Sequence, residues 1–168
     1  YKRQLLNKSD GYYLAITTYR DKNMSPGRKY IPGSVIGLDF GLSTAITTSE
    51  GECLNLYVEE TDRLKRLQKK LSRQTKGSNN YTKTCILIRR EHQKMENKKK
   101  DLAYKLVSDL SHYEHVFLQD EMISNWKQRQ GYARGGKKIQ KGILGRLKAF
   151  LRTKDWATML SRGDATTQ

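Results

Sequence analysis

Residues 35–41 read VIGLDFG, an apolar run with one carboxylate, Asp39, near its end. A short continuous apolar run of this kind predicts a buried β-strand. A carboxylate within such a strand is costly to bury unless it is paired or binds a cation. The residues alone leave two interpretations of Asp39 open: a metal ligand, or a cap for the turn that Gly41 favours.

Further strand-like segments lie on both sides of this run. Residues 44–48 alternate, residues 49–51 (SEG) predict a turn, and residues 53–58 predict another strand, so we expect a three-stranded meander. Residues 11–19, GYYLAITTY, are aromatic and β-branched, which also favours a strand. We expect residues 1–30 to be the tail of a preceding β domain and its connector.

The hydrophobic period then becomes helical. Leu64, Leu67 and Leu71 are three and four residues apart, and lysines and arginines occupy the other faces. Residues 77–80, GSNN, interrupt this pattern, and a second, longer helix follows with apolar positions at the same spacing. We therefore predict a basic helical hairpin inserted at residues 61–112.

A fourth strand and one more helix complete the pattern. Residues 116–118 are apolar and run into Gln119, Asp120 and Glu121. Apolar side chains at four-residue spacing then predict an amphipathic helix. Strands, a helical excursion, a lone strand and a helix predict an α/β domain with a mixed sheet over residues 31–168, in an order that matches the RNase H fold. The helix carries its apolar side chains at Ile139, Ile143, Leu147 and Leu151.

The acidic residues at two strand ends predict a metal site. Glu121 follows an apolar triplet, much as Asp39 lies near the end of its own apolar run. Carboxylates at the ends of adjacent strands are suitable ligands for Mg²⁺ or Mn²⁺, which can activate water and stabilise the leaving oxygen of a phosphodiester. Asp120 is a poorer ligand candidate than Glu121, because neighbouring strand residues face opposite sides of a sheet, and a shift of the strand register by one residue would reverse this assignment.

The charge of the chain is strongly positive and unevenly placed. The net charge is +16, and residues 62–105 hold 15 of the 33 lysines and arginines but 4 of the 17 acidic residues. A charge run of this kind is often only a solvated helix face. An excess of positive charge as uneven as this one favours contact with the phosphates of a nucleic acid, because each neutralised phosphate releases counterions and so adds affinity.

The chain is expected to be intracellular and cytoplasmic, in association with the nucleoid. No apolar run approaches the length that spans a bilayer, and no signal-peptide pattern follows the basic start. Cys53 and Cys85 form no CxxC pair, so neither a zinc site nor a disulfide framework is predicted from these residues.

Five segments in order resemble the transposon-encoded TnpB proteins and their relatives, the type V CRISPR effectors. The resemblance covers residues 33–168, and the order of the segments is more specific than any one of them. Residues 35–51 resemble the first RuvC motif, residues 63–80 the helical insert and residues 116–126 the second RuvC motif. The matching strings are VIGLDFGLSTAITTSEG, RLKRLQKKLSRQTKGSNN, VFLQDEMISNW, KKIQKGILGRLKAFLR (137–152) and ATTQ (165–168).

This resemblance implies a RuvC-like nuclease of RNase H fold that hydrolyses DNA under the direction of a guide RNA. It assigns Asp39 and Glu121 as catalytic residues that bind Mg²⁺ or Mn²⁺. The third aspartate of the family lies beyond a zinc ribbon, so Zn²⁺ is implied only there, and we expect this sequence to stop before both and to be inactive alone. The phosphate contacts implied on the basic helices are Lys65, Arg66, Lys69, Lys70 and Arg73.

Two alternatives stay open. One is a nuclease-inactive, RNA-guided DNA-binding regulator of the same family. The other is a basic nucleic-acid-binding scaffold without a metal site. An aromatic residue, Trp126, has two interpretations as well: a platform for base stacking or an ordinary core or interface side chain.

Overall fold

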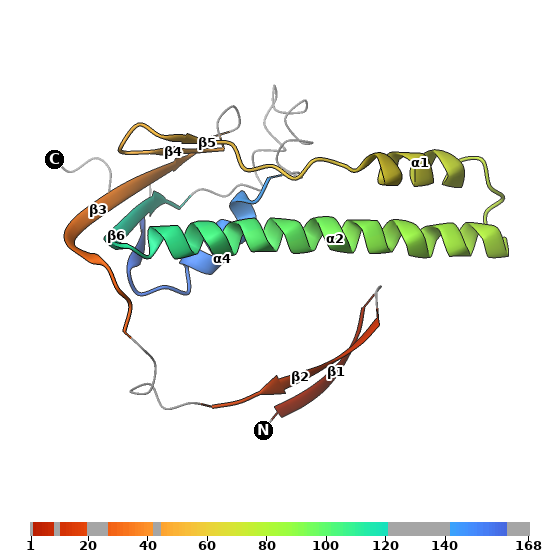
Figure 1. The fold of residues 1–168 in the computed structure, drawn as a ribbon, viewed down its shortest axis with the longest axis horizontal. Helices are drawn as coiled ribbons and strands as arrows, with labels where there is room; N and C mark the ends of the chain where they lie inside the picture. The colour runs from red at the N-terminus through yellow and green to blue at the C-terminus, as the bar shows by residue number, and fades with distance from the viewer. Residues whose placement is uncertain (1, 9–10, 20–26, 42–44, 121–141, 161–168) are drawn as a thin grey trace. The chain divides into compact units, whose positions relative to one another are not determined.

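A computed structural model describes residues 2–8, 11–19, 27–41, 45–120 and 142–160 (Figure 1). None of the described helices is long and apolar enough to cross a membrane. The chain divides into two compact units, one made of Tyr1–Gly27 with Glu60–Asn97 and the other of Arg28–Glu59 with Lys98–Gln168. The elements are β1 (Lys2–Lys8), β2 (Gly11–Thr17), β3 (Ile31–Phe40), β4 (Ile46–Thr48), β5 (Cys53–Leu54), α1 (Asp62–Leu71), α2 (Asn79–Leu110), β6 (Tyr113–Gln119), α4 (Leu144–Leu151) and β7 (Ala157–Leu160).

The first two strands form a separate antiparallel hairpin, in which Lys8 pairs with Gly11 and Lys2 with Thr17. The strand expected in residues 11–19 is therefore confirmed. The assignment of residues 1–30 to a preceding domain stays a prediction.

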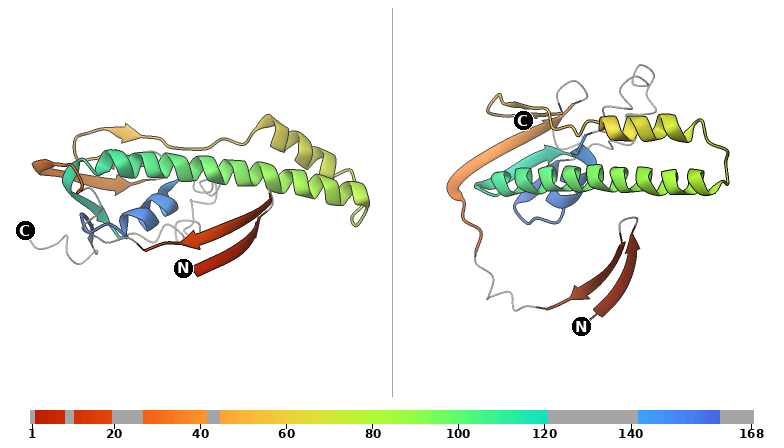
Figure 2. Two further views of the ribbon diagram at one scale, coloured as in Figure 1. Left: turned by 60° about the horizontal axis from the view of Figure 1, so that its bottom comes forward. Right: turned by 45° about the vertical axis from the view of Figure 1, so that its right-hand side comes forward.

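The second unit contains a mixed five-stranded sheet in the order β5-β4-β3-β6-β7. β3 pairs antiparallel with β4, and β4 pairs antiparallel with β5, which confirms the predicted meander. On its other side β3 pairs in parallel with β6, which pairs in parallel with β7. Figures 1 and 2 show β3 and β6 side by side. The α/β class and the mixed sheet are thus confirmed.

Two strand predictions need correction. The strand expected over residues 53–58 is confined to β5, because the amide of Ala45 donates to the side-chain oxygen of Asn55 (3.1 Å) where a backbone ladder would otherwise continue. β7 was not predicted either, because its residues ATML carry little of the β-branched and aromatic signal of a strand. β7 adds a second parallel partner to the sheet beyond β6.

One face of this sheet builds the core. Alternate residues of β3 and β6 are buried, and they pack with side chains from the C-terminal half of α2 and from α4. The remaining side chains of both strands point to the opposite face, as the two-residue period of a strand requires. Two helices therefore cover the same face of the sheet. The core residues of these elements are Ile36, Leu38, Phe40, Val116, Leu118, Val107, Leu110, Leu147 and Leu151.

Arg28 holds the chain before β3 beside the start of β6. Its guanidinium donates to the carbonyl oxygens of Ser111 (3.1 Å), Glu114 (2.9 Å) and Tyr113. It also lies 4.5 and 5.0 Å from the ring centres of Tyr30 and Trp156. Several acceptors and two aromatic faces satisfy a planar cation well, so Arg28 stabilises the parallel pairing of β3 with β6.

The two basic helices predicted for the hairpin are confirmed as α1 and α2, and α1 and the first part of α2 belong to the first unit. Thr61 caps α1 by accepting from the amide of Leu64 (3.2 Å), and Leu64 is fully buried. Gly77 has a positive φ of 85°, a conformation that favours glycine at the break before α2. In α4, by contrast, the described helix starts at Leu144, and Ile139 lies outside the described residues.

Glu91 of α2 has a nearly buried side chain, 6% exposed. Its Oε1 lies 3.1 Å from Nζ of Lys94 and 3.5 Å from Nε of Arg63, which belongs to α1. The hydrogen bond from Lys94, and then the positive charges of Lys94 and Arg63, lower the pKa of Glu91 despite its burial. The carboxylate therefore joins α1 to α2.

Replacing this carboxylate should weaken the hairpin in a pH-dependent way. A carboxyl group with a lowered folded pKa stabilises the fold above its unfolded pKa of about 4.3, and this stabilisation is lost as the pH falls through the folded value. We expect Glu91→Gln to lower the melting temperature at pH 7 and the difference to shrink below about pH 4. Circular dichroism melts from pH 3 to 7 measure it. Glu60→Gln, at an exposed position, is the control; an equal effect of both changes would contradict the role of Glu91.

Candidate metal and nucleic-acid site

Asp39 lies near the end of β3 and is exposed, between the buried Leu38 and Phe40. Its side chain therefore points to the face opposite the hydrophobic core. Its carboxylate forms no hydrogen bond and no ion pair with any described residue. The amide of Gly41, in the turn that Asp39 could have capped, donates instead to the backbone carbonyl of Ala45 (3.3 Å). This exposed position avoids the cost of desolvating the charge and leaves both oxygens accessible to a cation.

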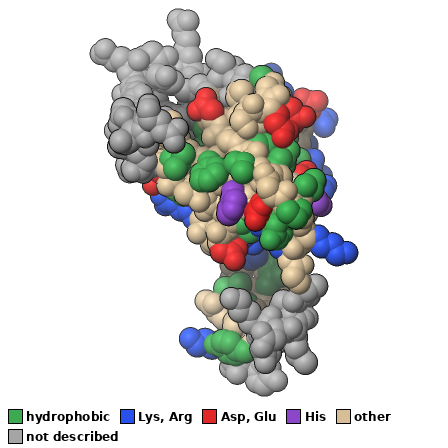
Figure 3. Space-filling model, turned by 90° about the vertical axis from the view of Figure 1, so that its left-hand side faces the viewer, with side chains coloured by type: hydrophobic (Ala, Val, Ile, Leu, Met, Phe, Trp, Pro, Cys, Tyr) green, Lys and Arg blue, Asp and Glu red, His purple; other side chains and the backbone are tan. Residues whose placement is uncertain are grey.

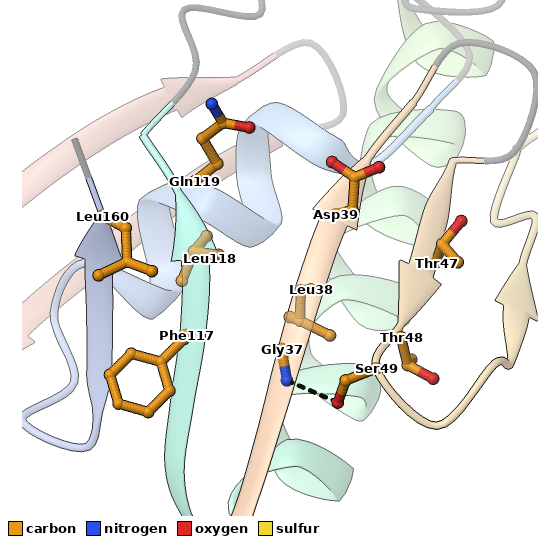
Figure 4. A pocket seen from close by; sticks show the side chains of 10 residues that line it. All are labelled: Gly37, Leu38, Asp39, Thr47, Thr48, Ser49, Phe117, Leu118, Gln119 and Leu160. Carbon is orange, nitrogen blue, oxygen red and sulfur yellow. Dashed lines mark hydrogen bonds between the residues drawn. The ribbon is translucent and has the colours of Figure 1, made fainter. Parts of the chain in front are cut away.

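A hollow of about 410 Å³ adjoins Asp39 on this face of the sheet (Figure 4). Gly37 forms part of the floor of the hollow and has no side chain to fill it. Its amide donates to the hydroxyl of Ser49 (3.0 Å). Gln119 at the end of β6 lines the same hollow as Asp39. The residues around the hollow are Gly37, Leu38, Asp39, Thr47, Thr48, Ser49, Phe117, Leu118, Gln119 and Leu160.

Gln119 lines the hollow, although it was not among the predicted site residues. β3 and β6 run in parallel, and Leu38 is the partner of Leu118 in their register. Asp39 and Gln119 each follow one of these paired leucines and lie on the face opposite the core. The alternation from the buried Leu118 was the signal available in the sequence.

Asp120 behaves differently from Asp39. One of its carboxylate oxygens lies 2.6 Å from Nζ of Lys148 and 2.8 Å from Nη2 of Arg152, and both cations belong to α4. The hydrogen bond from Lys148 is the largest cause that lowers the pKa of Asp120, and Arg152 adds to it. Asp120 is thus engaged by the helix on the core side of the sheet.

Two of the described side chains carry oxygen donors that suit a metal ion. Glu121 and Trp126 lie outside the described residues. Within the described ranges no group of three or more His, Cys, Asp or Glu side chains could hold a metal ion. Asp39 offers a hard carboxylate oxygen and Gln119 an amide oxygen, both of which suit Mg²⁺ or Mn²⁺. These residues fit such an ion, although its full coordination needs further ligands.

The five predicted phosphate contacts are all exposed on α1 or just after it. Lys65 lies 3.4 Å from Asp62, whereas the other four form no ion pair with any described residue. Figure 3 shows one face of the described structure, where hydrophobic and acidic side chains gather and lysines and arginines lie mostly at the margin. In the sequence the positive charge is concentrated in residues 62–105, which hold 15 of the 33 lysines and arginines. The four cations without a described partner are Arg66, Lys69, Lys70 and Arg73.

Comparison with known proteins gives two matches. Residues 19–117, more than half of the chain, match the model of the OrfB_IS605 family, described as "Probable transposase". The chain is also 33% identical over 96 residues to the Escherichia coli K12 protein named "Putative RNA-guided DNA endonuclease InsQ". That match covers 55% of this chain and 24% of the relative, so the chain spans about a quarter of the relative's length. By the extent of the first match, the chain belongs to the OrfB_IS605 family of transposase-like proteins, the TnpB family.

Proposed function

We propose that the chain is part of an RNA-guided DNA endonuclease with a RuvC-like centre of RNase H fold. The observation that carries the proposal is the carboxylate of Asp39 near the end of the central strand. It forms no hydrogen bond or ion pair with any described residue and lies beside an open hollow. The sheet supports it as well, since three antiparallel strands followed by two parallel ones match the strand pattern of the RNase H fold. The printed name of the relative supports the class of reaction.

In this proposal Asp39 and Glu121 hold Mg²⁺ or Mn²⁺. Such ions, when bound, activate water and stabilise the leaving oxygen of a phosphodiester. Asp39 contributes a carboxylate that needs no rearrangement of described partners before it can bind a cation. The hollow leaves room beside it for a nucleotide of the DNA strand.

The basic hairpin would contact the phosphates of the guide RNA or of its duplex with the target. Base pairing with the guide selects the DNA, and the protein holds the duplex through its backbone. The exposed cations of α1 suit that role because a phosphate contact requires charge and reach rather than a particular base sequence.

The test is cleavage by the full-length protein loaded with its guide. We expect the protein to cut matched DNA in Mg²⁺, to stop when the ion is chelated, and to resume when Mg²⁺ or Mn²⁺ is added back. DNA binding, measured by gel shift in the chelator, should persist. Cutting in the chelator would exclude the metal mechanism. Binding without cutting under every condition would show the nuclease-inactive regulator instead.

A further inference from the structure

The end of β6 is fixed to its neighbours on two sides. Its last residue, Gln119, lines the hollow beside Asp39. At the next position the amide of Asp120 donates to the carbonyl of Leu160 in β7 (2.8 Å), so the sheet pairing extends through this residue. The backbone that supports one wall of the candidate site is therefore held by β7.

The side chain of Asp120 provides the second attachment. Its Oδ1 lies 2.6 Å from Lys148, and Nη2 of Arg152 lies 2.8 and 3.1 Å from its two oxygens. Lys148 and Arg152 are four residues apart, on successive turns of α4. The helix itself is anchored by Leu147 and Leu151, both fully buried.

Burial makes this ion pair different from an exposed one. The side chain of Lys148 is only 11% exposed, and that of Asp120 is 37% exposed. The charge of a nearly buried ammonium group must be compensated, and removal of a carboxylate that lies against it is costly. Exposed ion pairs such as Lys105 with Asp101 carry no such cost.

We propose that Asp120 is a positioning residue for the metal site. Its attachment to Lys148 and Arg152 on the core side fixes the end of β6, and so fixes the residue beside Asp39 on the opposite face. Supporting side chains of this kind orient the ligands of a metal without touching it. The inference rests on the proposed function, in which Asp39 binds the metal ion, and on the position of Gln119, the last residue of β6, in the lining of the same hollow.

The key comparison is between Asp120→Asn and the double variant Asp120→Asn with Lys148→Met. The single change removes the negative charge beside the nearly buried Lys148, so it should lower the melting temperature. The double change also removes the buried charge and should restore much of that stability, because apolar replacements of a buried pair are well tolerated. A residue that only stabilises the fold should recover its function together with its stability.

We expect Mn²⁺ binding and DNA cleavage to stay impaired in the double variant, even though its stability recovers. Mn²⁺ binding by the full-length protein without DNA, followed by electron paramagnetic resonance of free Mn²⁺, should weaken by about 10- to 100-fold in both variants. The DNA cleavage rate at low Mg²⁺ should fall by a similar factor, and DNA binding should change little. Asp120→Glu, which keeps the negative charge, should retain most of the Mn²⁺ affinity and most of the cleavage rate of the unmodified protein. Asp155→Asn and Lys154→Met change exposed residues nearby and should have no effect.

The outcomes separate this inference from the proposed function. If Asp39→Ala loses Mn²⁺ binding while the double variant binds Mn²⁺ and cuts like the unmodified protein, Asp120 is merely structural and the inference is wrong. The proposed function would then stand. If the unmodified protein binds no Mn²⁺ through Asp39 and does not cut, the proposed function fails and the inference fails with it.

Discussion

Asp39→Ala is expected to abolish detectable DNA cleavage by the guide-loaded, full-length protein. The change removes the one carboxylate on the described rim of the hollow and, with it, a proposed ligand of the metal. Loss of a supporting residue of a metal site costs about 10- to 100-fold, and loss of a preorganised transition-state group about 100- to 1000-fold. Removal of a direct ligand should therefore cost at least about 100-fold.

Folding should not explain this loss. The side chain of Asp39 is exposed and has no described partner, so its removal breaks no described interaction that stabilises the sheet. Single-turnover cleavage assays in Mg²⁺ measure the effect, with gel shifts and melting curves as checks that binding and folding persist. Asp155→Ala, at another exposed aspartate, is the matched control. A variant at Asp39 that cuts at the unmodified rate would refute the metal-ligand role.

The central strand β3 and the helical hairpin of α1 and α2 could be predicted from the sequence. Apolar residues 35–38 and the spacing of Leu64, Leu67 and Leu71 reflect burial on one face, which is a local property of the chain. By contrast, residues 31–34 were not expected to be part of a strand, since Pro32 and Gly33 suggest a connector. Pairing with β6 draws them into β3, with a shift in register before Val35.

The partners within the site were harder to predict than its strands. Asp120 contacts Lys148 and Arg152, 28 and 32 positions further along the chain. Such contacts depend on how a helix packs across a sheet, which no local period encodes. The alternation of strand residues places Gln119 on the same face as Asp39, but an uncharged amide is a weaker signal of a metal site than the two carboxylates that follow it.

Neutralising the four cations on α1 and just after it that form no ion pair with a described residue should weaken nucleic-acid binding in a way that depends strongly on salt. The variant changes Arg66, Lys69, Lys70 and Arg73 to glutamine. Each duplex phosphate contact contributes about 0.9 to the slope of log affinity against log salt, and each single-strand contact about 0.7. If all four residues contact phosphates, the slope should fall by about 3.6 for a duplex or about 2.8 for a single strand.

The affinity itself should fall by about fivefold at 0.15 M salt for each phosphate that is no longer neutralised, which follows from the same counterion release. Fluorescence anisotropy with guide RNA, and separately with a guide–target duplex, from 0.05 to 0.4 M salt, measures slope and affinity together. Glutamine is chosen because it is a good helix former, so α1 should persist. Circular dichroism checks this, since Lys69 and Lys70 also favour the last turn of the helix.

Lys29 and Lys154 provide the matched control. Both are exposed and form no ion pair with a described residue, and both lie outside the basic hairpin. Their double change to glutamine removes two charges and should leave the slope nearly unchanged, whereas Lys69→Gln with Lys70→Gln should lower it by about 1.4 to 1.8. Equal effects of the two pairs would mean that the positive charge of the whole protein, and not the surface of α1, attracts the nucleic acid. If the slope of log affinity against log salt is unchanged in the fourfold variant, these four cations do not contact phosphates, and the basic surface of α1 is only a solvated helix face.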